Sequence, residues 1–304
     1  MTVPFNKPST SIPEQIVLLQ DRGLIINDFS SAGHYLKHIG YYRLAGYWRF
    51  FQADPIKHIF ARGATLDSVL ELYSFDRELR ILLMEAIESI EVSFRSVLIN
   101  EMCTKYGPTW YANPQYAFRE DIFDSTLVVI DKELQRSNEE FVAHHDRKYG
   151  NVNYPPAWKT LQTLSFGTLS RIYGNIHNDI PERKEIAKIY GLPAEAWLHS
   201  WMQVISVLRN YCAHHSRLCF RVFSFPPKDI HRPRLPWIKN MPPSGALPSQ
   251  QLYYQLCPVR YLLHTCAPGT LFNSKLRELV AKYPKIELTR LGFMPGWEKE
   301  DLWK

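Results

Sequence analysis

The chain has 304 residues, of which 45% are hydrophobic and 22% are charged. This is the balance of a soluble globular protein with enough apolar material for a sizeable core. The formal net charge is +6, from 36 Lys and Arg against 30 Asp and Glu. Such a mild excess does not identify a nucleic-acid binder, although it favours an acidic partner over a basic one.

The sequence gives no sign of a membrane or secretory protein. No stretch approaches the roughly 20 apolar residues that span a bilayer, and Met1 to Ser11 do not resemble a targeting segment. The five cysteines are odd in number, and no two have the spacing of a zinc site. We therefore expect a cytoplasmic protein with reduced thiols, no membrane contact, no metal and no cofactor.

The N-terminal region predicts a small helical lobe rich in aromatic residues. Helices are expected over Pro13–Gly23 and Ser30–Ile39, each ending at a glycine. A dense aromatic and basic run, Tyr41–Phe51, follows. Its rings and cations could stack unpaired bases and bind phosphates, or the rings could simply pack in the lobe. The candidate RNA-binding residues of this run are Tyr41, Tyr42, Arg43, Trp48 and Arg49.

The strongest helical signal runs from Thr65 to Tyr106. Thr65 can cap the helix, and Asp67 favours its positive N-terminal end. Apolar residues recur at three- and four-residue steps, and Gly107-Pro108 ends the pattern. A helix of this length indicates a helical bundle.

Further helical patterns fill most of the remaining chain. They span Ile122–His145, Trp158–Tyr173, Glu182–Tyr190, Glu195–Leu218, Gln250–His264 and Thr270–Tyr283. Seven prolines between Pro226 and Pro248 predict irregular structure there. Strand signals are sparse. We predict an all-α fold in one compact unit: an N-terminal aromatic helical lobe over residues 1–58, a helical core over 59–225, and a Pro-rich linker with C-terminal helices over 226–304.

An Arg followed after four to six residues by a His recurs in the chain. With 20 Arg and 11 His, chance alone gives about two such pairs, so the spacing proves nothing. The pairs are Arg209–His214, Arg209–His215 and Arg171–His177. The last spans Gly174, a helix-stop residue, whereas Arg209 follows a long apolar stripe.

The predicted helix places Asn210 and His214 one turn apart on the same face. Arg209 and His214 lie about 140° apart on an ideal helix, given its 3.6-residue period. They converge only if the helix bends or the arginine side chain reaches round it.

These residue types suffice for RNA cleavage without a metal. RNA carries its own nucleophile, the 2′-hydroxyl. Histidine can transfer the proton as base or acid, and arginine binds phosphate oxygens in a fork. One His fills only one proton-transfer role, so His215 or a second subunit would supply the other.

The same residues could instead form a polar network that holds the bundle together. Charged residues are also distributed along the long predicted helix. Asp76 and Arg80, like Glu91 and Arg95, are four residues apart, which favours ion pairs along its surface. Alternatively, one of these carboxylates orients Arg209.

The segment Leu208–Leu218 resembles the signature of the Abi family of abortive-infection proteins, within the HEPN superfamily of Arg-x(4–6)-His ribonucleases. Other blocks agree with it over nearly the whole chain. They are Gly23–Ile26, Ile39–Trp48, Phe75–Arg80, Leu164–Ser170 and Leu291–Trp297. Cys219-Phe220-Arg221 departs from the expected ending of the signature.

The resemblance implies a HEPN-like helical bundle and a toxin-like RNA endonuclease in phage defence. It implies a catalytic set of Arg209, Asn210, His214 and His215, with Arg217 as a further RNA contact. It also implies a homodimer in which two motifs face each other, and a small antitoxin RNA as a further partner. The alternative is a non-catalytic RNA-binding HEPN module held in a complex with such an RNA.

Overall fold

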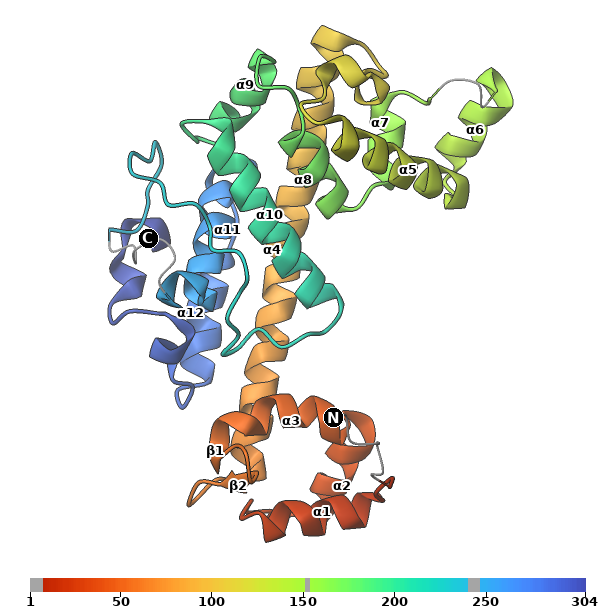
Figure 1. Ribbon diagram of the computed structural model, residues 1–304. Helices are drawn as coiled ribbons and strands as arrows, with labels where there is room; N and C mark the ends of the chain where they lie inside the picture. Colours follow the sequence, from red (N-terminus) through yellow and green to blue (C-terminus); the bar gives the residue numbers. More distant parts are fainter. Residues whose placement is uncertain (1–7, 151–153, 240–246) are drawn as a thin grey trace, which may run out of the picture. The chain divides into compact units, whose positions relative to one another are not determined.

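The computed structural model describes residues 8–150, 154–239 and 247–304. Within these ranges it contains twelve α-helices, short 3-10 turns and one two-stranded sheet (Figure 1). The predicted all-α class is therefore confirmed. None of the helices in the described ranges combines the length and hydropathy that crossing a bilayer demands.

The chain contacts divide into two compact units. One holds the chain up to Leu79 together with Leu279–Ile286, and the other holds Arg80–Glu278 together with Glu287–Lys304. The long helix α4 (Leu66–Tyr106) contributes residues to both. The three segments expected from the sequence stay a prediction.

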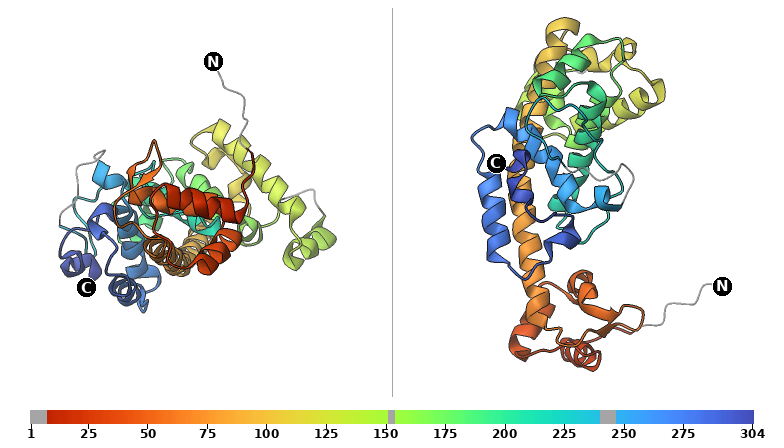
Figure 2. Two further views of the ribbon diagram at one scale, coloured as in Figure 1. Left: turned by 90° about the horizontal axis from the view of Figure 1, so that it is seen from below. Right: turned by 90° about the vertical axis from the view of Figure 1, so that its left-hand side faces the viewer.

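The first unit begins with three short helices and a hairpin. The helices are α1 (Ile12–Asp21), α2 (Phe29–His38) and α3 (Tyr41–Trp48), and the strands are β1 (Gln52–Asp54) and β2 (Ile59–Phe60). Figure 2 shows them from two further directions. Ser11 and Glu14 form a capping box on α1, which satisfies two backbone N–H groups at its start.

The aromatic run of the sequence is helix α3. Its apolar side is buried: Leu44, Tyr47 and Trp48 are at most 3% exposed. The hydroxyl of Tyr47 donates to the buried carboxylate of Asp76 on α4 at 2.8 Å. Hydrogen bonding of this kind is what makes a buried polar group tolerable, so this contact ties α3 to α4.

The prediction for α4 is confirmed to within one residue. Thr65 caps the helix, because its hydroxyl accepts a hydrogen bond from the N–H of Ser68 at 3.1 Å. Its buried residues continue through both units, and Gly107, with φ of +85°, follows its last residue. Glycine adopts this backbone conformation without steric cost.

The second unit adds a set of shorter helices to α4. They are α5 (Glu120–Arg136), α6 (Glu140–Tyr149), α7 (Ala157–Thr160), α8 (Phe166–Gly174), α9 (Pro181–Ile189), α10 (Glu195–Ala213), α11 (Leu252–Cys266) and α12 (Phe272–Lys282), the last of which ends in the first unit. The described residues between Pro226 and Leu247 form no regular element, as the prolines predict. Residues 240–246 of this stretch lie outside the described residues.

Two helices predicted as continuous are each broken in two. The pattern over Ile122–His145 divides into α5 and α6, because Ser137 and Glu139 have extended backbone conformations. The pattern over Trp158–Tyr173 divides at Leu164. The hydroxyl of Ser165 accepts from the N–H of Thr168 and starts α8 as a new helix, since serine is a favoured N-cap residue.

His199 of α10 lies against α8 at its last residue. A Cβ atom built on Gly174 would lie 2.2 Å from Nε2 of His199, so the missing side chain makes room for the imidazole. Burial lowers the pKa of His199, and the charge of Arg183 lowers it further. The neutral imidazole is thus the form that the folded state prefers.

The free energy of unfolding is expected to fall as the pH is lowered from about 7.5 to about 5.5. Unfolded histidine has a pKa of about 6.5, so the unfolded state gains a proton that folded His199 resists. His199→Gln should reduce this pH dependence in urea unfolding at the two pH values. Burial also lowers the pKa of His145 and His264, so some dependence should remain. A variant with an unchanged pH dependence would contradict the prediction.

Candidate functional site

Helix α10 carries the Arg–His motif on a rigid support. It packs along α8 (Figure 1). Its apolar stripe is completely buried at Leu198, Trp201, Ile205 and Leu208. Trp201 also donates from Nε1 to the carbonyl of Lys228 at 2.9 Å. Burial of such side chains stabilises each by about 1.5–3 kcal/mol, so the helix that presents Arg209 is firmly held.

Arg209 is held in place by a carboxylate of α4. Its Nε lies 3.6 Å from Oε2 of Glu91, and the two side chains are 35% and 16% exposed. The other oxygen of Glu91 lies 2.9 Å from Nη2 of Arg95. The predicted Glu91–Arg95 pair is confirmed, and a carboxylate of the long helix does contact Arg209. Partial burial of this pair limits its screening by water.

Helix α10 ends five residues earlier than predicted. Its last residue is Ala213, and His214 is the C-cap, with φ of −89° and ψ of 12°. The N–H of Ser216 donates to the carbonyl of Tyr211 at 2.8 Å, and the N–H of His215 donates to that of Cys212 at 3.1 Å. This pair of bonds is a Schellman motif. The expectation of a helix through Leu218 was wrong.

The histidine after the C-cap occupies the position that glycine usually fills. His215 has φ of +54°, a left-handed conformation that costs an L-residue about 1–2 kcal/mol. The chain then returns to the core, where Leu218 and Cys219 are completely buried. Non-glycine residues held in this conformation cluster at functional sites.

The helix end decides how the motif residues are arranged. His214 and Asn210 are both exposed, and the N–H of His214 donates to the carbonyl of Asn210 at 3.0 Å. The N–H of His214 still makes the helical bond to the residue four positions before it, so the angle of about 140° expected between Arg209 and His214 remains. Within the described part of the chain, no hydrogen bond joins the side chains of Arg209 and His214.

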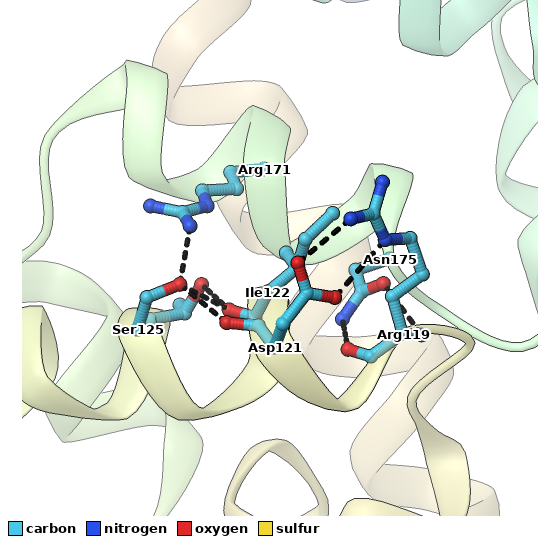
Figure 3. A network of polar contacts seen from close by, with 7 residues as sticks. Arg119, Asp121, Ile122, Ser125, Arg171 and Asn175 are labelled. Carbon is cyan, nitrogen blue, oxygen red and sulfur yellow. Dashed lines mark hydrogen bonds and ion pairs between the residues drawn. The ribbon is translucent and has the colours of Figure 1, made fainter.

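Each residue of the Arg171–His177 pair has another partner, and Figure 3 shows the partner of Arg171. Arg171 on α8 donates to the hydroxyl of Ser125 on α5. His177 instead lies 3.4 Å from the carboxylate of Asp179. Neighbouring polar side chains are also engaged, since Arg119 binds Asp121 and Asn175 donates to the carbonyl of Arg119. Arg171 therefore belongs to the contacts between α5 and α8, whereas His177 pairs within its own loop.

A family model described as Abi-like protein matches residues 34–219. That range is more than half of the chain and contains Arg209, Asn210, His214 and His215. The chain belongs to the Abi-like protein family. Abi stands for abortive infection, so membership indicates a role in this form of defence. No curated protein and no solved structure matches the chain.

The match to the Abi-like family is shorter than the resemblance suggested. It leaves out the blocks at Gly23–Ile26 and Leu291–Trp297, which lie outside residues 34–219. It ends at Cys219, where the sequence departs from the expected signature. The motif of the Abi-like protein thus lies at the C-terminal end of the matched range.

The predicted RNA-binding side chains lie in the first unit, except for Arg217. Tyr42 is 86% exposed, Arg43 and Arg49 are exposed, and Tyr41 is half-buried. Trp48 is only 3% exposed and has the ring of Tyr41 at 4.8 Å between centroids. It has no face open to a base, so including Trp48 in the stacking surface was wrong. Its burial follows from its position on the core side of α3.

Arg217 follows the end of α10 in the second unit. It is half-buried, and its guanidinium group donates to the carbonyl of Cys219. Part of its hydrogen-bonding capacity therefore fixes the chain after the motif. Among the described residues, no three His, Cys, Asp or Glu side chains form a group that could hold a metal ion.

The sequence did not show which carboxylate of the long helix would pair with Arg209. Several acidic residues share α4, and their spacing to nearby arginines gives equivalent ion-pair patterns. Only the packing of α10 beside α4 distinguishes Glu91, because it alone of them pairs with Arg209 in the described chain.

Proposed function

We propose that this Abi-like protein is a metal-independent RNA endonuclease that acts as a toxin in abortive infection. The observation that carries the proposal is the arrangement at the end of α10. Arg209 is fixed by Glu91 at 3.6 Å, while His214 is exposed at the C-cap, one turn after exposed Asn210. A cation paired with a carboxylate and a solvent-accessible imidazole, five residues apart at the end of one helix, are the two kinds of group that metal-independent phosphodiester cleavage requires.

The proposed reaction uses the 2′-hydroxyl of the RNA as nucleophile. His214 accepts the proton of this hydroxyl, and the 2′-oxygen forms a bond to phosphorus. The bond from phosphorus to the 5′-oxygen breaks, leaving a 2′,3′-cyclic phosphate, and a second acid gives a proton to the departing oxygen. Arg209 binds the phosphoryl oxygens through its fork of donors. Asn210 positions the substrate.

The second proton-transfer group is proposed to come from His215 or from a partner subunit. The HEPN resemblance favours two copies of the chain with their motifs facing each other. The exposed end of α10 supports this proposal because His214 and His215 are both accessible there. His215 also carries the backbone strain that marks functional sites.

Light scattering at micromolar concentration is expected to give twice the mass of the 35.6 kDa chain.

If each site combines an arginine and a histidine of different subunits, mixed Arg209→Ala and His214→Ala proteins should regain part of the cleavage activity that each lacks. A monomer with full activity would contradict both the mass and the shared site.

RNA binding is also proposed to involve the exposed face of α3. Between residues 29 and 64 the only acidic residue is Asp54. The basic residues of this stretch are Lys37, Arg43, Arg49, Lys57 and Arg62. Together with exposed Tyr42 they offer cations and an aromatic ring, the features that bind single-stranded RNA.

Arg43→Ala or Arg49→Ala is expected to weaken RNA binding and to flatten its dependence on salt. Each lost phosphate contact should lower the slope of log affinity against log salt by about 0.7 for single-stranded RNA. Fluorescence anisotropy over a range of salt concentrations measures both quantities. Unchanged affinity in the two folded variants would assign this face a purely structural role.

The proposed function is tested by incubating purified protein with RNA in the presence of EDTA. Cleavage should persist, and the products should end in a 2′,3′-cyclic phosphate. The second candidate is a non-catalytic RNA-binding module held in a complex with a small antitoxin RNA. Stable RNA binding without cleavage would favour that module, and neither binding nor cleavage would contradict both.

A further inference from the structure

A groove borders Arg209 along one face of α4. Its volume is about 530 Å³, within the range of small-ligand sites. Charged residues contribute most of its polar lining: Glu85, Glu88, Glu91, Arg95 and Arg209. All of them belong to the second unit.

At one end of the groove, two guanidinium groups share one carboxylate. Glu91 contacts Arg95 through one oxygen at 2.9 Å and Arg209 through the other at 3.6 Å. The Nε atom of each arginine is buried and makes no hydrogen bond. These two Nε atoms are closed to the groove, so a ligand there would meet the guanidinium groups through their Nη atoms.

Arg95 is anchored by two contacts that leave some of its N–H donors available to a ligand. Its side chain is 14% exposed, and Nη2 also donates to the carbonyl of Leu164 at 3.1 Å. The contacts with Glu91 and Leu164 both use Nη2, whereas a guanidinium group has five N–H donors. The remaining donors sit on a side chain whose orientation is already fixed, which lowers the entropic cost of binding a phosphate.

The other carboxylates of the groove do not cancel this charge. Glu85 is paired with Lys275, whose Nζ lies 2.6 and 2.8 Å from its two oxygens. Glu88 is exposed, so water screens its charge. The end of the groove formed by Glu91, Arg95 and Arg209 therefore keeps one positive charge more than its carboxylate neutralises.

We propose that Arg95 is a second phosphate-binding residue of the site, and that Glu91 is the positioning residue that fixes Arg95 and Arg209 side by side. The ligand is a backbone phosphate of the RNA that the motif acts on, so the inference rests on the proposed function and names a further contact to its substrate. Two preoriented guanidinium groups can bind the non-bridging oxygens of a phosphate better than one.

Binding to RNA with 2′-O-methyl groups tests Arg95 separately from cleavage, because this RNA lacks the nucleophile. Arg95→Gln should weaken binding roughly tenfold and lower the salt slope by about 0.7, the value for one phosphate on a single strand. Arg136→Gln is the matched control. Arg136 is also an arginine in a helical ion pair, with Glu133 on α5, but its side chain is 66% exposed.

Arg95→Lys keeps the positive charge and most of the aliphatic stem. It therefore provides a second test of the assignment if Arg95→Gln fails to fold. It should retain the melting temperature of the wild type and still bind more weakly, because an ammonium group cannot form the fork. Folded Arg95 variants with the affinity and salt slope of the wild type would overturn the assignment.

Glu91→Gln tests the positioning role, since it removes the charge and nearly preserves the shape. We expect kcat to fall at least tenfold while RNA binding is unchanged or tighter, because a negative charge has left a phosphate site. Glu133→Gln, a carboxylate outside the groove that is 17% exposed and paired with Arg136 on α5, should leave both quantities unchanged. A parallel loss of binding, kcat and melting temperature in Glu91→Gln would indicate a merely structural role and overturn the assignment.

The two proposals fail in different ways. A wild-type protein that binds 2′-O-methyl RNA through Arg95 but does not cleave natural RNA overturns the nuclease and keeps the phosphate site. A wild-type protein that cleaves RNA, with Arg95 variants that bind as it does, keeps the nuclease and overturns the phosphate site.

Discussion

His214→Ala is expected to lower the rate of RNA cleavage by about 10² to 10⁴, the usual contribution of general acid–base catalysis. The protein should still fold. His214 is exposed, and the hydrogen bonds that end α10 are made by the backbone N–H groups of residues 214–216, which the alanine variant retains. The single-turnover cleavage rate and the melting temperature of the variant measure the two effects separately.

His215 provides the matched control, provided that the substituted residue fits its backbone conformation. His215 has φ of +54°, so alanine there would add strain to any loss of chemistry. Asparagine adopts this conformation more readily, and His215→Asn should keep the Schellman motif. A partial defect would suit an auxiliary proton-transfer role. If His214→Ala folds and cleaves RNA at the wild-type rate, the chemistry lies elsewhere in the molecule.

Arg209→Ala should lower the cleavage rate by about 10² to 10³, the loss typical of removing one preorganised donor to a developing anion. Glu91 keeps its partner Arg95 at 2.9 Å in this variant, so no unpaired carboxylate is created and the fold should survive. Arg209→Lys should recover only part of the activity, because an ammonium group lacks the planar fork.

A matched surface variant separates this effect from a general loss of positive charge. Arg232 is exposed in the irregular segment after α10, and Arg232→Ala should cleave RNA at the wild-type rate. Full activity in Arg209→Ala would refute the proposed phosphate contact. An unfolded Arg209→Ala would instead support the view that the motif is a polar network holding the bundle together.

Local patterns predicted the helices whose signals are complete within one stretch of sequence. Helix α4 has a capping threonine, a sustained apolar period and Gly107 directly after its last residue, so its bounds were predicted to within one residue. The break between α5 and α6 has no such signal. Ser137, Asn138 and Glu139 contain neither glycine nor proline, and polar residues of this kind occur in helices and in turns alike.

The local sequence pattern also lacks a signal for the end of α10, which lies at the candidate site. His214-His215-Ser216 carries no glycine and no proline, so periodicity extended the predicted helix to Leu218. In the structure, Leu218 and Cys219 are completely buried. Their burial draws the chain back into the core, and we infer that it stabilises the left-handed conformation of His215 against its local cost.

The sequence by itself determined the all-α class, the course of α4 and the motif residues, because helix periodicity and residue chemistry are local properties. Tertiary structure decided which carboxylate meets Arg209 and which aromatic rings are accessible. Glu91 is distinguished only by the packing of α10 beside α4, and Trp48 is excluded from base stacking only by its burial on the core side of α3. Both facts depend on contacts between residues distant in the chain, and no local pattern records these contacts.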